Sequence, residues 1–323
     1  MATASAADEP VLTDDAKRLF LFPLKYEDVY KHYKKHITTF WTVEEVDLAR
    51  DYLAYQKLEK GTQRFIAMTL AFFSQADAVV MENISDNFAE EMKPLEHRMF
   101  LSMQVFIEGV HSEMYALLLQ TIVKDPEERT KLIHGVTTYP CLAAKHAWVC
   151  GYMDRAKPFA SRLLAFTILE GVFFSSAFCS IYYLKKKGVE MPGLISSNEF
   201  ISRDEGLHRD FGVMVYKDLK NKLPEAEVHQ MFTSAVAIEC RCISDALPVA
   251  LIGMNKDSMG QYVRFVADGL LQALGYSKLW NASNPFPFMN LISVQRKTNF
   301  FEARVSEYAR ADIDFKFSTT EDF

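Results

Sequence analysis

The sequence has little of what marks secreted, membrane-spanning or nucleic-acid-binding proteins. Its five cysteines contain no C-x-x-C pair, so neither a disulfide framework nor a thiolate zinc site is expected. It has no run of about 18 uncharged apolar residues, and its start lacks the cationic head and apolar body of a signal peptide. The net charge of −6 argues against nucleic acid, because phosphate binding needs a basic face. We therefore expect a cytoplasmic protein without membrane or nucleic-acid partners.

Alternating strand patterns, internal repeats and glycine-rich phosphate loops are also absent. Apolar residues instead recur with helical spacing. Thr42 and Glu45 have the capping-box spacing that opens a helix in WTVEEVDLARDYLAY, and MPG at 191–193 is predicted to be a turn. Further helices are predicted over 61–92, 94–123, 126–135, 141–153, 158–187, 197–222, 224–247 and 258–276. The pattern predicts an all-α protein.

The predicted helices define one main domain with loose ends. It covers 21–295, after a flexible segment at 1–20 and before a tail at 296–323 that loses apolar periodicity. Cys240 and Cys242 point to different sides of their predicted helix, which is typical of packing thiols, and we have no functional account of them.

Three long apolar stretches each contain a single acidic residue. Asp77 is the only charge in FIAMTLAFFSQADAVVM, Glu108 the only charge in MFLSMQVFIEGV, and Glu170 the only charge in LLAFTILEGVFFSSAFCSIYYL. An ionised carboxylate is almost never buried alone, because its desolvation costs several kcal/mol. Three such acids on separate helices need either one arginine each or a shared cation. A metal cluster would satisfy all three together.

Two E-x-x-H pairs complete a candidate ligand set. Of the eight histidines, only His111 and His208 have a glutamate three residues earlier, and positions i and i+3 share a helical face. Two such pairs plus one acid from each of two other helices form the ligand pattern of di-iron and di-manganese bundles. Six oxygen and nitrogen ligands suit iron or manganese better than zinc. The predicted ligands are Asp77, Glu108, His111, Glu170, Glu205 and His208.

Simpler interpretations of each residue stay open. A single E-x-x-H usually lies on a helix surface, and the charged segment RDEGLHRD around Glu205 could be a solvated face. Asp77 could be a buried cap, and Glu170 could pair with Arg162 or Lys185. The coincidence of both pairs with lone acids on separate helices favours the dinuclear site.

Tyr115 lies on the same predicted helical face as the first E-x-x-H pair, four residues after His111. It could be an ordinary core tyrosine, but a cluster that activates dioxygen could remove one electron from a phenol beside it. Phe174 and Phe178, one and two turns after Glu170, are predicted to face the cluster and could exclude water, or could simply belong to the core.

Seven segments together resemble the small, radical-generating subunit of class I ribonucleotide reductase, of the eukaryotic type. They are FWTVEEVDL, AFFSQADAVVMEN, IEGVHSEMY, LEGVFFSSAF, NEFISRDEGLHRDF, ALPVALIGMN and KTNFFEARVSEY. The resemblance implies a ferritin-like helical bundle with two iron ions. One iron would be bound by Asp77, Glu108 and His111, and the other by Glu170, Glu205 and His208.

The resemblance also implies roles outside the ligand set. Tyr115 matches the radical tyrosine, and the terminal tail resembles the peptide that docks into the large catalytic subunit, with Phe317 and Phe323 as its aromatic anchors. The residues that match the radical-transfer path are Trp41, Asp204 and Tyr308.

The implied activity is the reduction of ribonucleotides to deoxyribonucleotides. The di-iron centre would use dioxygen to oxidise Tyr115 to a stable radical, and the radical would pass to the large subunit. A homodimer is expected, and manganese remains an alternative to iron. Other hypotheses are a different ferritin-like oxidase or hydroxylase, an iron-storage protein, or a purely structural bundle.

Overall fold

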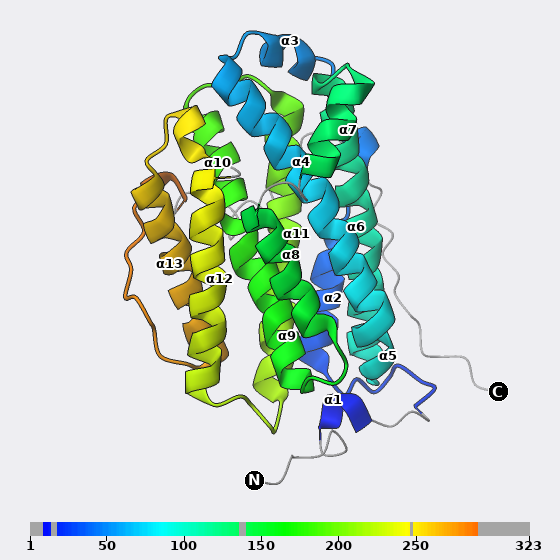
Figure 1. Cartoon of the computed structure of the whole chain (residues 1–323). Coiled ribbons are helices and arrows are strands. Elements are labelled where there is room, and N and C mark those ends of the chain that lie inside the picture. Colours follow the sequence, from blue (N-terminus) through cyan, green and yellow to red (C-terminus); the bar gives the residue numbers. More distant parts are fainter. Residues whose placement is uncertain (1–8, 14–17, 136–139, 246–247, 290–323) are drawn as a thin grey trace, which may run out of the picture. The chain divides into compact units, whose positions relative to one another are not determined.

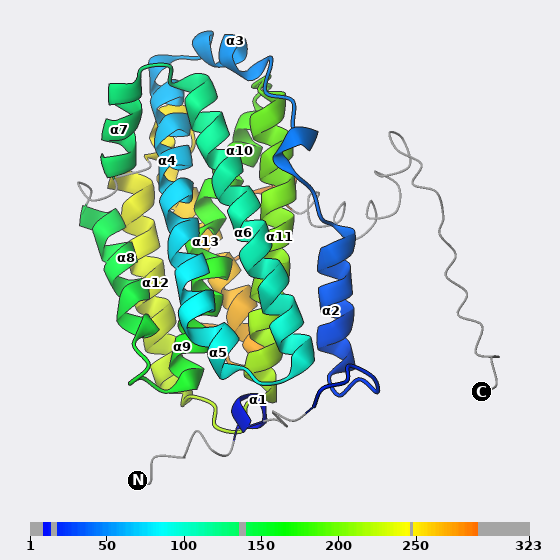
Figure 2. The same ribbon diagram turned by 90° about the vertical axis from the view of Figure 1, so that its right-hand side faces the viewer.

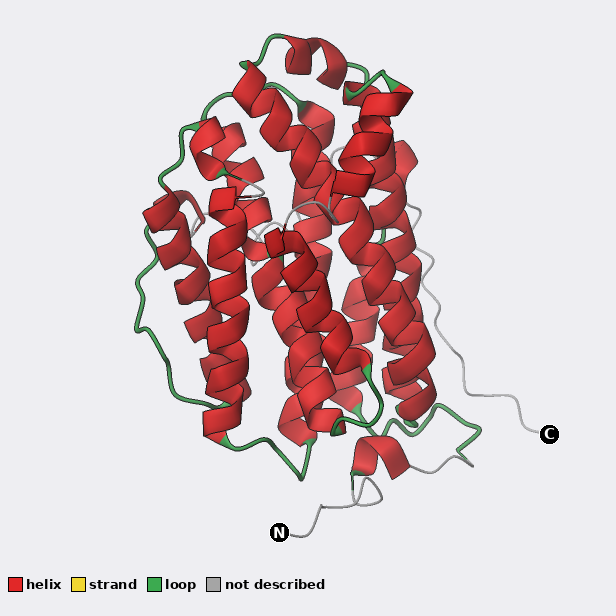
Figure 3. Cartoon of the chain, viewed as in Figure 1, coloured by secondary structure: helices red, strands yellow, loops and turns green. Residues whose placement is uncertain are grey.

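The computed structural model describes residues 9–13, 18–135, 140–245 and 248–289, and this described part contains helices and loops but no strand (Figure 3). The all-α prediction is therefore confirmed. The chain divides into two compact units, Met1–Pro285 and Phe286–Phe323. The helical bundle belongs to the first unit.

The bundle is built from long helices joined by short loops (Figure 1). The α-helices are α1 (Pro10–Thr13), α2 (Glu27–Thr38), α3 (Asp51–Gln56), α4 (Lys60–Asn83), α5 (Ala89–Glu91), α6 (Leu95–Ile122), α7 (Pro126–Gly135), α8 (Pro140–Met153), α9 (Phe159–Ile168), α10 (Ser175–Lys186), α11 (Pro192–Asp218), α12 (Glu225–Asp245) and α13 (Lys256–Leu274). Two 3₁₀ turns, η2 (Val43–Glu45) and η5 (Val249–Ile252), and two π-helical turns, η3 (Ile84–Phe88) and η4 (Leu169–Phe173), complete the set.

Four helical rods surround the core: α4, α6, the continuous α9–η4–α10 rod, and α11. Helix α4 packs along α6, and α9 packs along α11. Helix α2 contacts both α6 and α11 from outside, as Figure 2 shows. The side chains between these rods are mostly Phe, Leu, Ile and Val, and their burial is the main favourable term in folding.

Two helical runs are apolar enough to resemble membrane spans, but they lie inside the bundle. These are Lys60–Glu91, whose most apolar window is 61% buried, and Phe159–Lys186, whose window is 94% buried. A helix that is apolar all round and packed on every side is typical of the core of a large protein. Packing on every side thus accounts for the second run, whereas the first run is buried over only part of its surface.

Local signals explain where several helices begin and end. Pro94 and Pro158 immediately precede α6 and α9, where a missing backbone donor costs nothing. Helices α10 and α13 are followed by Gly188 and Gly275, whose φ angles of 81° and 94° suit glycine. Tyr276 N donates back to Leu271 O at 2.9 Å and closes the last turn of α13.

The structure differs from the sequence prediction near the N-terminus and at α11. The capping-box segment forms only the short turn η2, in which Thr42 N donates to Glu45 Oε1 at 3.1 Å, and the separate short helix α3. The predicted turn at 191–193 was wrong, because Pro192 occupies the first turn of α11. A proline is favoured at that position for the same conformational reason that places it in turns.

Part of the predicted flexible segment 1–20 contacts the bundle. The Glu9 carboxylate accepts hydrogen bonds from Lys220 N and Asn221 N at 2.9 and 2.7 Å, and Lys93 N donates to Val11 O at 2.9 Å. No local pattern predicted these contacts, because the hydrogen bonds of Glu9 join residues more than two hundred positions apart in the sequence.

Candidate metal centre

The six predicted ligands come together inside the bundle. Four rods contribute them: α4 provides Asp77, α6 provides Glu108 and His111, η4 provides Glu170, and α11 provides Glu205 and His208. All six are at least 96% buried, with exposures between 0 and 4%. The RDEGLHRD segment therefore places Glu205 and His208 in the core rather than on a solvated face.

Two glutamates lie between the two histidines. Glu108 Oε2 is 3.2 Å from His111 Nδ1, and Glu108 Oε1 is 2.9 Å from His208 Nδ1. Glu205 repeats this arrangement, with Oε1 at 3.1 Å from His111 Nδ1 and Oε2 at 3.4 Å from His208 Nδ1. Each carboxylate thus offers one oxygen toward each histidine, which is the geometry of a bridging ligand between two metal positions.

The two remaining acids lie at opposite sides of this arrangement. The ligand atoms of Asp77, Glu108 and His111 all lie within 4.8 Å of one another. The same limit holds for Glu170, Glu205 and His208 together with Glu108. The resemblance implied two sets of three ligands, whereas in the structure Glu108 lies close to the members of both sets.

The two cations considered as simpler partners for Glu170 form ion pairs with other acids. Arg162 pairs with Glu91, and Lys185 pairs with Glu199 at 2.5 Å, so neither neutralises Glu170. Glu170 Oε1 instead accepts a hydrogen bond from Gln104 Nε2 at 3.1 Å. Asp77 lies within a helical run that continues to Glu91 and is not a cap.

The electrostatics of the cluster fit a bound cation. Asp77 Oδ2 and Glu170 Oε2 are buried without a hydrogen-bond partner among the described residues. Burial and the carboxylates around them raise the pKa of both acids well above the usual range. A raised pKa favours the protonated form of an acid, so a metal ion that binds these acids would compete with protons. The donor set, four carboxylates and two imidazoles without sulfur, suits iron or manganese.

The outer nitrogen of His111, Nε2, faces away from the two glutamates and is connected to Trp41 through Asp204. His111 Nε2 lies 3.3 Å from Asp204 Oδ2, which also accepts the Trp41 Nε1 proton at 2.8 Å. Arg203 contacts the other oxygen of Asp204 at 3.2 Å. Burial opposes the charge on Asp204, but its hydrogen bond with His111 and the Arg203 charge lower the pKa below the usual range. His111, Asp204 and Trp41 thus form one hydrogen-bonded chain.

The outer nitrogen of His208 has a different partner, which sequence reasoning missed. His208 Nε2 lies 2.9 Å from Nε2 of His36 in α2, a residue only 1% exposed. His36 follows no ligand motif, and no sequence signal predicted that α2 would lie against α11.

Tyr115 is buried beside the cluster among aromatic rings. It is 3% exposed, and its ring stacks on Phe73 with centroids 4.7 Å apart. Phe178 stacks on the same phenylalanine at 4.9 Å, and Phe174 packs against it at 5.8 Å. Tyr115 Oη has no hydrogen-bond partner in the described part of the chain. Burial and the nearby Asp77 charge raise the pKa of this phenol well above its usual value.

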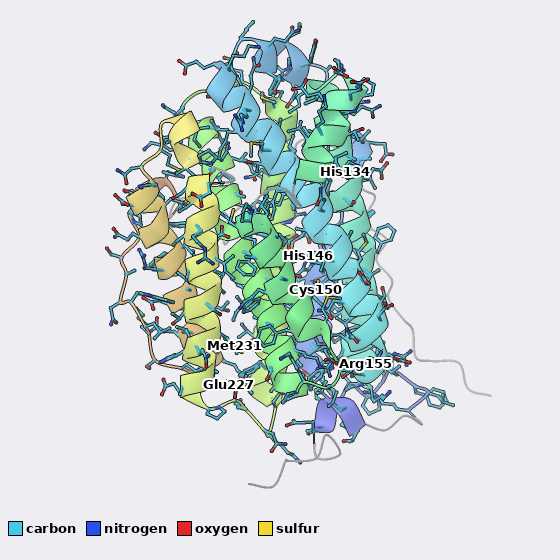
Figure 4. The ribbon with its side chains drawn as sticks, in the orientation of Figure 1. His134, His146, Cys150, Arg155, Glu227 and Met231 are labelled. Carbon is cyan, nitrogen blue, oxygen red and sulfur yellow. The ribbon has the colours of Figure 1, made fainter. Side chains whose placement is uncertain are left out.

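Other chemistry-bearing residues lie outside this cluster. Figure 4 shows His134 on α7 and His146 and Cys150 on α8, helices that carry none of the ligands. The described residues contain no further group of three or more metal-binding side chains. Cys242 is buried and Cys240 is partly exposed, so the two do point to different surroundings. The predicted relay and docking residues Tyr308, Phe317 and Phe323 lie outside the described residues.

Fold and site together define a class. A helical bundle with four acids and two histidines converging in its core is a ferritin-like protein with a candidate dinuclear metal site. Residues 18–285 match the family model "Ribonucleotide reductase, small chain". The chain belongs to this family.

Known proteins of the family align over nearly the whole chain. The ribonucleoside-diphosphate reductase small chain of Nicotiana tabacum is 48% identical over 306 residues, covering 95% of this chain and 93% of that protein. The small chain of Trypanosoma brucei brucei is 47% identical over 307 residues, covering 95% and 91%. These relatives support the eukaryotic type predicted from the sequence.

Solved structures show the same bundle. The ribonucleotide reductase Rnr4 homodimer from Saccharomyces cerevisiae matches with a TM-score of 0.81 and 33% identity, covering 90% of this chain and 93% of that chain. The dimanganese(II)-NrdF of Streptococcus sanguinis matches with a TM-score of 0.70 at 18% identity, covering 83% and 96%, and supports the fold alone. The ferritin-like fold prediction is confirmed.

Proposed function

We propose that this chain generates a tyrosyl radical on Tyr115 and supplies it to a separate large subunit. The chain is a ribonucleoside-diphosphate reductase small chain, an oxidoreductase, as its family and its relatives indicate. The observation that carries the radical assignment is the buried phenol of Tyr115 beside six converging metal-ligating side chains.

Two divalent ions fit the charge of the cluster. Four carboxylates carry four negative charges, which two divalent ions would balance in a site that excludes water. Asp77 and His111 would help to hold one ion and Glu170 and His208 the other, and Glu108 and Glu205, which lie close to both histidines, would complete the ligand set. When bound, an iron or manganese pair would activate dioxygen, which is the oxidant.

The protein's own residues would then protect and move the radical. The rings of Phe73, Phe174 and Phe178 exclude water and reductants from Tyr115, so a neutral radical would persist. The hydrogen-bonded chain from His111 through Asp204 to Trp41 joins the cluster to a second oxidisable side chain. Asp204 would hold the indole proton while Trp41 transfers an electron.

Family membership implies a large catalytic subunit and a homodimer. We further propose that the tail docks to the large subunit through Phe317 and Phe323, with Tyr308 as the relay, and that the protein acts in the cytoplasm. A segment without apolar periodicity that carries two aromatic anchors suits reversible docking. A synthetic peptide that spans Phe317 to Phe323 should compete with the small chain for the large subunit. The same peptide with both phenylalanines changed to alanine should not compete.

The test of the radical assignment is spectroscopic. Apoprotein is loaded anaerobically with iron(II), oxygen is admitted, and the electron paramagnetic resonance spectrum is recorded. We expect an organic radical signal in the parent, none in Tyr115→Phe, and the parent signal in Tyr182→Phe, a matched control at another buried tyrosine.

Two outcomes would contradict the proposal. A parent-like signal in Tyr115→Phe would place the radical elsewhere. Iron uptake without an organic radical in the parent would favour a different ferritin-like oxidase or an iron-storage protein.

A further inference from the structure

The two metal-facing histidines differ in what lies behind them. His111 Nε2 faces a carboxylate, Asp204, at 3.3 Å, whereas His208 Nε2 faces another imidazole, that of His36, at 2.9 Å. Histidines that bind metals usually donate their outer N–H to an acceptor, which fixes ring orientation and tautomer. The partner of His208 therefore matters to whatever His208 binds.

The direction of this hydrogen bond follows from the inner side of the ring. His208 Nδ1 points at Glu108 and Glu205, 2.9 and 3.4 Å away, so this nitrogen would bind the metal. The proton of a neutral, metal-bound His208 then resides on Nε2, which must donate to His36 Nε2. His36 can accept only as the neutral tautomer that carries its own proton on Nδ1.

Helix α2 is held in the register that this contact needs. One turn before His36, His32 Nε2 lies 2.8 Å from Leu207 O, so residues i and i+4 of α2 meet consecutive residues of α11. The fully buried Phe100 of α6 stacks on His32 at 5.3 Å and packs against His36 at 5.5 Å. The imidazole of His36 thus has little freedom to turn away.

We propose that His36 is a positioning residue for the metal position at His208, because it accepts the His208 Nε2 proton and fixes that ring's tautomer and orientation. The inference rests on the metal assignment in the proposed function. It makes the two positions unequal, since a carboxylate acceptor raises the basicity of a ligand imidazole more than a neutral imidazole does. It also makes α2 a fifth contributor to the site.

The first test measures metal binding rather than activity. Manganese(II) is titrated calorimetrically and anaerobically into the full-length apoprotein, and His208→Ala identifies which of the two binding events belongs to His208. His36→Leu removes the acceptor at similar volume and should weaken that event by about 10- to 100-fold while leaving the other within about threefold. His36→Gln, whose amide oxygen can accept the proton, should restore most of the affinity.

A matched control separates hydrogen bonding from general packing. His97 is equally buried at 1% exposure and contacts Tyr26 and Phe211, but it contacts no ligand. His97→Leu should leave both binding events unchanged. Equal weakening by His97→Leu and His36→Leu, or an unchanged affinity in His36→Leu, would overturn the inference.

A second measurement uses the parent protein alone. In the zinc(II)-loaded parent with ¹⁵N-labelled histidine, long-range ¹H–¹⁵N spectra should show the His36 proton on Nδ1 and a bare Nε2. A proton on His36 Nε2 would reject the inference. If the parent binds no pair of ions, the proposed metal centre fails and this inference fails with it; if it binds two and His36→Leu matches it, this inference alone fails.

Discussion

Glu96 shows at the residue scale how this protein buries a carboxylate without a metal. It is fully buried, yet its oxygens accept hydrogen bonds from both Arg18 terminal nitrogens and from Lys25 N, each at 2.9 Å. Burial opposes its charge, but these donors lower its pKa to about 2. Asp77 and Glu170 are equally buried without such donors, and their pKa values rise. Charged and backbone donors thus distinguish Glu96 from these two acids, of which Glu170 accepts only from the Gln104 amide.

The Glu96 contacts predict a pH-dependent loss of stability. Glu96→Gln should lower the free energy of unfolding at pH 7 by about 3–4 kcal/mol, since the pKa falls from 4.5 to about 2 and one pKa unit corresponds to about 1.4 kcal/mol. A lowered folded-state pKa stabilises above the ordinary value of 4.5, and the stabilisation is lost as the pH falls toward about 2. The difference in urea unfolding between parent and variant should therefore shrink as the pH falls from 4.5 to 3 and vanish only near pH 2.

The exposed Glu113 on the same helix serves as the control, because Glu113→Gln should leave unfolding nearly unchanged at every pH. A constant difference between parent and Glu96→Gln down to pH 3 would show that the carboxylate charge is not the source.

The ligand set could be predicted from single residues, but its geometry could not. Lone acids in apolar runs and the E-x-x-H spacing are visible in the chain itself. That Glu108 and Glu205 each face both histidines depends on how α6 and α11 pack. The His36 contact spans 172 positions in sequence and has no local signature.

At the element scale, a buried ion pair ties three helices together beside the π-helical turn that carries Glu170. Lys145 of α8 lies 2.5 Å from Glu239 of α12 and donates to Phe173 O at 3.1 Å. Ser176 of α10 donates to the same glutamate. A π turn is costly and frequently marks a functional site, and here the lysine bonds to the carbonyl of its last residue.

Breaking this pair should be costly. Lys145→Met leaves Glu239 charged and buried, so we expect a loss of about 3–5 kcal/mol in the free energy of unfolding. The double variant Lys145→Met/Glu239→Leu removes both charges and should recover much of the loss. Urea titration of the apoproteins measures both. If the double variant were less stable than Lys145→Met, the two residues would stabilise the fold by some means other than the neutralisation of each other's charge.

Close helix approach at Gly212 supports a further prediction. A Cβ atom there would lie 2.4 Å from Thr167 Oγ1, and that hydroxyl is held by its bond to Leu163 O at 2.8 Å. Gly212→Ala should therefore destabilise the protein by about 1–3 kcal/mol through overpacking. Gly206 lies on the same helix with open space at its Cβ position, so Gly206→Ala should be neutral or stabilising by up to about 1 kcal/mol.

Thermal unfolding of the two alanine variants side by side checks this contrast. Equal effects of the two substitutions would mean that α9 and α11 can separate at no cost.

Most helices could be predicted because proline, glycine and apolar spacing are local signals. The π turns could not, because they depend on packing around an extra residue. Helix α2 was missed because its mixed sequence EDVYKHYKKHIT shows its core-facing histidines as ordinary polar residues.

At the scale of the whole molecule, metal binding and folding should be linked. The site exists only in the folded chain, so free metal at about 100 times its dissociation constant should stabilise the protein by about 2.7 kcal/mol. The midpoint of thermal unfolding should rise when manganese(II) is added to the apoprotein. Glu108→Gln alters a ligand shared by both positions and should abolish most of that rise. A metal-dependent rise of the parent's size in Glu108→Gln would place the binding elsewhere.

The same linkage has a pH dependence. In the metal-free protein, the Glu108 and Glu205 charges outweigh burial and raise the pKa of His208 to about 9, so this imidazole binds a proton at neutral pH. Metal must displace it, so manganese affinity should increase as the pH rises from 6 to about 9. Calorimetry in two buffers of different ionisation enthalpy would count the released protons, and a pH-independent affinity would contradict the protonated ring.

The short segment 36–41 determines what must be copied to transplant this centre into a smaller scaffold. The hexapeptide HITTFW, residues 36–41, supplies the outer partner of His208, which is His36, and also Trp41, which donates to the α11 aspartate behind His111. A designer who copied only the four ligand-bearing rods would reproduce every candidate ligand and Asp204, but would lose His36 and Trp41. A transplanted centre that keeps both contacts therefore needs the four rods and the segment 36–41.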